Sequence, residues 1–146
     1  MSIVNSFPQR TSAVKLIEAV QNDGTAITSV IIDRLGYQSA KLTLNWAASS
    51  GTPTTAAASL KFYSNSASSS SSPTPVELVE LESALNVKTA GFAQYDIDLS
   101  NAKRYVYAVL DITYADGTTP KNILAADLVL ADKSAQPANS GTVYGR

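Results

Sequence analysis

Apolar and polar residues alternate along several stretches of this chain, and the longest of them ends in a turn. Residues 103–114 read Lys-Arg-Tyr-Val-Tyr-Ala-Val-Leu-Asp-Ile-Thr-Tyr and run into Ala115-Asp116-Gly117. Strand-favouring residues followed by an Asp-Gly turn predict a long β-strand. One face of this strand is apolar, and the other carries Tyr105 and Tyr107 among polar residues. We expect the first face in the core and the second at a surface that meets solvent, a sugar or a partner subunit.

Six further stretches have the alternation of strands and are separated by turn-forming residues. They lie at residues 13–20, 28–35, 37–46, 58–63, 94–99 and 122–130. Loops rich in Ser, Thr, Gly and Pro are expected at 47–57 and 64–75, and the second contains five consecutive serines, Ser68 to Ser72. Trp46 shares an apolar face with Leu42 and Leu44, which predicts a place in the core.

One segment, Pro75 to Leu85, has a pattern that favours a short helix. Thr74-Pro75-Val76-Glu77 has the form of a capping box with proline at the first helical position. Leu78, Leu81 and Leu85 follow at helical spacing. Val76, Leu78 and the neighbouring glutamates also alternate as in a strand, which is the second interpretation.

The strands do not alternate with helices, so the pattern predicts an all-β fold. We expect an antiparallel β-sandwich, either jelly-roll or immunoglobulin-like, with one short helix and extended terminal arms. The sandwich domain would span residues 13–131, between an N-terminal arm at 1–12 and a C-terminal arm at 132–146. The arms are polar, but Ile3, Phe7 and Tyr144 are apolar and need a surface to lie against.

Composition narrows the classes of partner. The 146 residues carry a net charge of −1, with basic and acidic residues scattered along the chain, so neither nucleic acid nor an anionic membrane is an expected partner. No stretch approaches the ~20 apolar residues of a membrane span, and the start lacks the features of a secretory signal. We therefore expect a protein made in a cytoplasm.

The chain contains no histidine and no cysteine. This excludes Ser-His-Asp and thiol catalysis, and it excludes imidazole and thiolate metal sites. Two carboxylate pairs remain, Asp96 with Asp98 and Asp111 with Asp116, but alternate residues of a strand point to the same solvent face, where they need no function. There is no glycine-rich phosphate loop. We expect no enzyme, no catalytic residue, no metal and no cofactor; a glycosidase using Asp96 and Asp98 is the least favoured class.

Tyrosine side chains offer another class of function. Tyr105, Tyr107 and Tyr37 could form a platform on which sugar rings stack, as in a carbohydrate- or receptor-binding module. The favoured explanation of the aromatic residues is burial, either in the sandwich core or under the serine-rich loops.

Three segments resemble small virion-associated proteins of tailed bacteriophages. They are Asp33 to Ala40, Lys103 to Val109 and Ala125 to Asp132. The resemblance implies a structural virion protein that binds the outside of a capsid as a decoration, cement or minor head protein. Its partners would be the major capsid protein and copies of itself, for instance in a trimer, and no catalytic residue carries over. The candidate partner contacts are Ile3, Phe7, Tyr105, Tyr107 and Tyr144.

Overall fold

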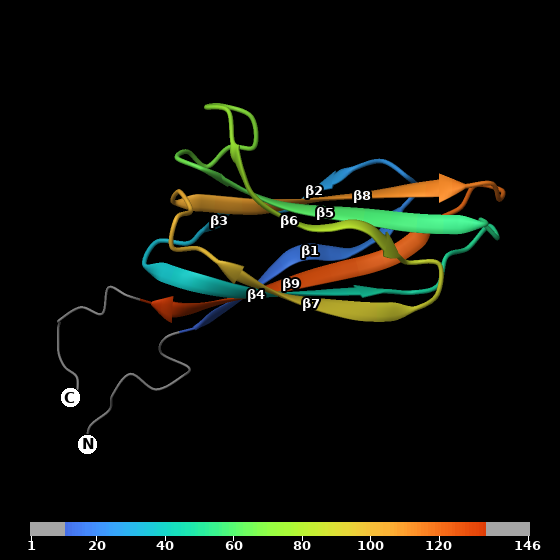
Figure 1. The fold of residues 1–146 in the computed structure, drawn as a ribbon, viewed down its shortest axis with the longest axis horizontal. Helices are drawn as coiled ribbons and strands as arrows, with labels where there is room; N and C mark the ends of the chain where they lie inside the picture. The colour runs from blue at the N-terminus through green and yellow to red at the C-terminus, as the bar shows by residue number, and fades with distance from the viewer. Residues whose placement is uncertain (1–10, 134–146) are drawn as a thin grey trace, which may run out of the picture.

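The computed structural model describes residues 11–133, and within them every regular element is a β-strand (Figure 1). The strands are β1 (Ser12–Asn22), β2 (Ile27–Thr28), β3 (Ile32–Asp33), β4 (Tyr37–Trp46), β5 (Thr55–Asn65), β6 (Val76–Asn86), β7 (Gly91–Asp98), β8 (Tyr105–Ala115) and β9 (Asn122–Lys133). The predicted all-β fold is confirmed. No helix of the described part is long and apolar enough to cross a membrane.

Two antiparallel sheets face each other. Sheet A has the strand order β1-β9-β4-β7, and sheet B has the order β2-β8-β5-β6, with β3 also paired to β8. Because β2 and β3 both lie along β8, they count as one interrupted strand. The pairs are then first with last (β1 and β9), second with second-last (β2/β3 and β8), and so inward through β4 and β7 to β5 and β6. This nested pairing is the jelly-roll arrangement, one of the two predicted topologies.

The core lies between the sheets and follows from the alternation of each strand. Leu42, Leu60, Leu110 and Leu128 point inward and are fully buried. Burying each such side chain contributes about 1.5–3 kcal/mol, so the central strands β4, β5, β8 and β9 hold the fold together. Trp46 packs against this core and stays partly exposed, with its indole N–H donating to the Thr89 carbonyl at 2.7 Å.

The helix predicted over residues 75–85 is wrong, because that segment forms the edge strand β6. It pairs antiparallel with β5, and the register shifts at three places along the pair. Each shift moves the inward-facing position by one residue, which breaks the period of two. Leu78, Leu81 and Leu85 are half-buried as a result, at a spacing that imitates a helix.

The strand predicted over residues 28–35 is interrupted. The Ser29 hydroxyl accepts a hydrogen bond from the Ala108 N–H at 2.8 Å, within sheet B. The next residue leaves that ladder, since the Val30 N–H donates to the Leu16 carbonyl of β1 in sheet A at 3.2 Å. The chain between β2 and β3 therefore ties the two sheets together along one side of the sandwich.

Both ends of the described chain lie at the same end of the sandwich (Figure 1). Ser12 pairs with Leu130, and Tyr37 at the start of β4 pairs with Lys133 at the end of β9. The strand β9 thus continues past the predicted end at residue 130.

At the opposite end, the loops around Gly51 and Gly117 touch. A Cβ atom on Gly51 would lie 2.4 Å from the Thr118 carbonyl oxygen, and Gly51 has a φ of +79°, so no other residue fits there.

Candidate interaction surface

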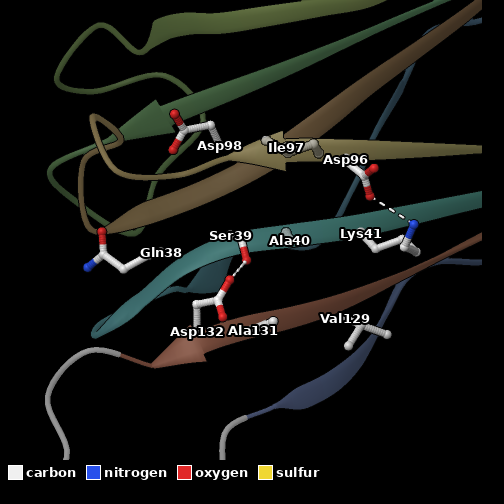
Figure 2. Close-up of a pocket in the computed structure, with 10 residues that line it drawn as sticks. All are labelled: Gln38, Ser39, Ala40, Lys41, Asp96, Ile97, Asp98, Val129, Ala131 and Asp132. Atoms are coloured by element: carbon white, nitrogen blue, oxygen red, sulfur yellow. Dashed lines mark hydrogen bonds and ion pairs between the residues drawn. The ribbon is translucent and has the colours of Figure 1, made fainter.

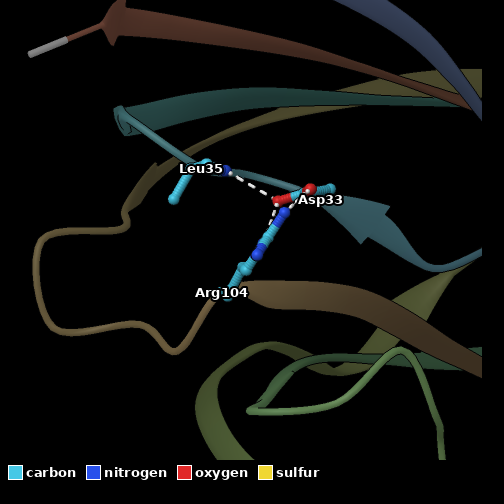
Figure 3. Close-up of polar contacts among 3 residues, drawn as sticks. All are labelled: Asp33, Leu35 and Arg104. Carbon is cyan, nitrogen blue, oxygen red and sulfur yellow. Dashed lines mark hydrogen bonds and ion pairs between the residues drawn. The ribbon is translucent and has the colours of Figure 1, made fainter. Parts of the chain in front are cut away.

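Parts of the three segments that resemble phage proteins meet at the end of the sandwich where the chain enters and leaves. Asp33 pairs with Tyr105 in sheet B, and Ser39 pairs with Ala131 in sheet A. The Arg104 guanidinium donates to both Asp33 carboxylate oxygens, at 3.1 and 2.8 Å (Figure 3). This hydrogen bond holds the pKa of the Asp33 carboxyl below its usual value, so Asp33 is ionised at neutral pH.

Arg34 fixes the neighbouring loops. Its Nε–H donates to the Lys103 carbonyl at 2.9 Å, and its Nη1 donates to the Tyr37 carbonyl at 3.0 Å. Its remaining nitrogen donates to the Ala102 carbonyl. One guanidinium therefore connects the turn before β4 to the loop before β8, using the fork of donors that only arginine has. This end of the molecule is preorganised, and a preorganised surface loses less conformational entropy when it binds a partner.

An open groove crosses the outer face of sheet A at the same end (Figure 2). Its volume is about 760 Å³, and it runs over β9, β4 and β7. The lining residues are Gln38, Ser39, Ala40, Lys41, Asp96, Ile97, Asp98, Val129, Ala131 and Asp132. The Ser39 hydroxyl donates to Asp132 Oδ2 at 2.6 Å, and the Lys41 ammonium lies 2.8 Å from Asp96 Oδ1. The groove is thus lined by small and apolar side chains and bordered by charged ones.

The carboxylate pair Asp96 and Asp98 stands on this face as expected for alternate residues of β7. Both residues are exposed, and Asp96 is paired with Lys41. The Asp98 carboxylate accepts the Ser100 N–H at 2.9 Å, which lowers the pKa of Asp98. A general acid needs a raised pKa, so the environment of Asp98 is opposite to the one that a glycosidase acid requires. Within residues 11–133, no group of three His, Cys, Asp or Glu side chains could hold a metal ion.

The structure places Tyr107 beneath the serine-rich loop. Its side chain is only 3% exposed, and its ring stacks on Tyr63 with centroids 5.4 Å apart and an interplanar angle of 12°. The Tyr107 hydroxyl donates to the Ser70 carbonyl at 3.3 Å. With the loop in this position, the face of the Tyr107 ring is covered and cannot stack on a sugar.

The other aromatic candidates have different surroundings. Tyr105 is half-buried, with the Arg104 guanidinium 5.2 Å from its ring centroid. The Lys133 ammonium lies 5.5 Å from the Tyr37 ring centroid. Both rings therefore already meet a cation of their own chain. Ile3, Phe7 and Tyr144 lie outside the described residues.

Sequence reasoning did not identify the groove. Its residues Ser39, Val129 and Ala131 are small or apolar residues at outward positions of two strands. They become neighbours only because β9 pairs with β4, a pairing between strands far apart in the sequence. Alternation shows which residues share a face of one strand, but not which strands are adjacent.

No protein-family model matches the chain, and no curated protein sequence is significantly similar to it. Solved structures do match in fold. VP2 in the infectious bursal disease virus subviral particle has a TM-score of 0.63 at 12% identity, covering 86% of this chain and 33% of VP2. A chain of the T13 viral particle of the same virus has a TM-score of 0.57 at 11% identity, covering 86% and 32%.

A further match is the PBSX exported protein XepA, with a TM-score of 0.54 at 14% identity, covering 92% of this chain and 42% of XepA. The chain thus spans less than half the length of each of these proteins. At such low identity the likeness shows a shared fold and nothing more.

Proposed function

We propose that this chain is a structural protein of a virus particle and acts there without catalysis. The observation that carries the proposal is the two-sheet fold of the chain, which matches VP2 of a subviral particle at a TM-score of 0.63. The resemblance to small virion proteins of tailed phages adds support, because the segments that carry it meet at one preorganised end of the sandwich.

In its finer form, the proposal is a decoration, cement or minor head protein on the outside of a phage capsid. The sandwich supplies a rigid body, and the arms at 1–12 and 132–146 contact the major capsid protein and neighbouring copies. Ile3, Phe7 and Tyr144 would be the apolar anchors, since a few buried side chains and main-chain pairing dominate contacts of this kind.

Removal of residues 1–10 tests the finer proposal, because it leaves β1 and its pairing with β9 complete. We expect the truncated protein to fold as the full chain does and to bind purified capsids with much lower occupancy, measured by co-sedimentation. A full-length variant with Ile3→Ser and Phe7→Ser should also bind capsids with lower occupancy, because it keeps the whole arm but lacks the two apolar anchor side chains.

Thr113→Ala is the matched control, since Thr113 is exposed on β8 in the other sheet. Its occupancy should equal that of the unmodified chain. Unchanged occupancy of the truncated and the Ile3, Phe7 variants would contradict a capsid-binding role for the N-terminal arm.

A further inference from the structure

The groove on sheet A lies where the described chain ends. Ala131 and Asp132 line it, and Lys133 is the next residue. Thirteen residues follow, from Ser134 to Arg146. Fully extended, they would reach about 43 Å, whereas the three strands under the groove span only about 10 Å between the outer two. The segment is therefore long enough to leave its own sandwich and lie across the groove of a neighbour.

The groove and this segment have complementary chemistry. The groove border carries three carboxylates, Asp96, Asp98 and Asp132, against one ammonium, Lys41. Lys41 is paired with Asp96, so the negative charge in excess lies toward Asp98 and Asp132. The only charged side chain of the segment 134–146 is Arg146.

Apolar contact adds to this match. Val129 and Ala131 are half-buried on the outer face of β9, where no other part of the described chain covers them completely. Val143 and Tyr144 are the large apolar residues of the segment. Placing them on Val129 and Ala131 would remove apolar surface from water on both sides.

The position of the turn-forming residues favours the groove of another copy. Asn139-Ser140-Gly141 is the strongest turn signal after Lys133. A hairpin centred on Ser140 would place Val143 opposite Pro137, which is not one of the residues that line the groove. Return of Val143 to Val129 of the same chain would need a reversal centred on Gln136, between Ala135 and Pro137, where neither glycine nor asparagine stands.

We propose that residues 134–146 of one copy dock in the sheet A groove of a second copy. The inference rests on the proposed function, because it names the surface that receives one of the two arms. If the arm docks in this way, the protein self-associates through its C-terminal arm whether or not a capsid is present.

Disulfide trapping tests this directly, because the chain has no cysteine and every disulfide would be an introduced one. Val129→Cys places a thiol in the groove, and Val143→Cys places one on the segment. Mixing the two single variants under mild oxidation should give a cross-linked heterodimer on a non-reducing gel, reversed by reductant. Ala131→Cys serves as a second groove variant in case Val129→Cys folds poorly, with circular dichroism as the check.

The matched control is Thr113→Cys, an exposed thiol on sheet B, mixed with Val143→Cys. Docking raises the local thiol concentration, so we expect about tenfold more cross-linked product with the groove variants than with this control. Equal yields, or no product from either groove variant, would overturn the inference. A chain carrying both Val129→Cys and Val143→Cys that closes only on itself would overturn it too, because the segment would then occupy its own groove.

A separate measurement keeps this inference apart from the proposed function. Light scattering after size exclusion should show smaller assemblies when Val143 and Tyr144 are replaced by Ser. Capsid co-sedimentation of the same samples reports the virion role on its own. Capsid binding without cross-linking would overturn the docking of the arm and leave the virion role standing. Cross-linking without capsid binding would overturn the virion role and leave the docking of the arm standing.

Discussion

At the scale of single residues, Asn65 holds the serine-rich loop in place. Its side chain is fully buried, and its amide nitrogen donates to the carbonyl oxygens of Ser69 and Pro73, both at 2.8 Å. The loop in turn covers Tyr107. The buried Asn65 amide thus helps to keep the loop over the Tyr107 ring.

Replacement of Asn65 by Ala removes both hydrogen bonds and leaves two carbonyl groups to find other partners. We expect a loss of about 1–3 kcal/mol in the free energy of unfolding, measured by urea denaturation. We also expect faster protease cleavage within residues 66–72. Ser68→Ala is the control, because Ser68 is exposed in the same loop. Cleavage of the Asn65→Ala variant at the rate of the unmodified chain would show that other contacts hold the loop.

The alternation of β8 correctly predicted that Tyr107 points away from the inner face between the sheets. It could not predict that the side chain is buried there, because the cover comes from a loop whose five serines have no apolar pattern. The interpretation that serine-rich loops cover aromatic residues, favoured for the tyrosines as a group, is confirmed for Tyr107. The Asn65 side chain holds the loop that covers Tyr107, and no pattern in the local sequence predicts this role of Asn65.

At the scale of elements, a strand is predicted correctly from the sequence where its pairing has no register shifts. The strand β4 pairs with β7 over eight consecutive positions without a shift, and its alternation correctly predicts a strand. The strand β6 has three shifts, and the spacing of its leucines predicts a helix instead of a strand. A bulge changes the face of every later residue, so a bulged edge strand loses the pattern by which strands are recognised.

The edge strands β6 and β7 belong to different sheets, and a side-chain hydrogen bond joins them. The Tyr95 hydroxyl donates to Glu82 Oε2 at 2.9 Å. Burial raises the pKa of Tyr95 above its usual value of 10.0, and the neighbouring Glu82 carboxylate raises it further. The neutral, donating form of Tyr95 is therefore favoured in the folded state.

Tyr95→Phe should destabilise the fold by about 1 kcal/mol at neutral pH, because a partly exposed hydrogen bond to a carboxylate is lost. The pKa of Tyr95 is higher in the folded than in the unfolded state, so its contribution is fully present below pH 10 and is lost as the pH rises above it. When the pH is raised from about 9 to about 11, the free energy of unfolding should therefore fall less for the Tyr95→Phe variant than for the unmodified chain.

Urea denaturation at several pH values measures this effect. Glu82→Gln is the matched variant, since it keeps an acceptor oxygen and removes the charge. At neutral pH, Glu82→Gln should lower the free energy of unfolding less than Tyr95→Phe does. Identical pH profiles for Tyr95→Phe and the unmodified chain would contradict the role given to this contact.

At the scale of the whole molecule, the chain passes repeatedly between the two sheets. Strands of sheet A pair with partners far away in the sequence, such as β1 with β9, and so do strands of sheet B, such as β2 with β8. Neither sheet is complete until nearly the whole described chain is in place. The molecule should therefore unfold as one cooperative unit.

The prediction can be tested with two fluorescence signals. Trp46 is the only tryptophan and lies in sheet A, so its fluorescence reports that sheet, and a variant with Trp46→Phe and Tyr63→Trp carries the same kind of probe in sheet B. Both signals should give the same urea midpoint, and refolding should take milliseconds to seconds, as in other folds dominated by non-local pairing. Two separate midpoints would show that one sheet persists without the other.

The sandwich could be predicted from the sequence, but the strand order could not. The stretches 37–46 and 122–130 were both recognised as strands, yet no feature of either says that they are neighbours. The groove depends on that adjacency, as does the meeting of Arg104 with Asp33. Long-range pairing is decided by the packing of the whole core, which a local pattern does not contain.

The pairing of Ser12 with Leu130 has a practical consequence for anyone who would use this protein as a carrier. A peptide fused before residue 12 and another fused after residue 133 would emerge side by side from the same end of the sandwich. The loops around Gly51 and Gly117, at the opposite end, would remain free of cargo. A single copy could thus display two different antigens at neighbouring points.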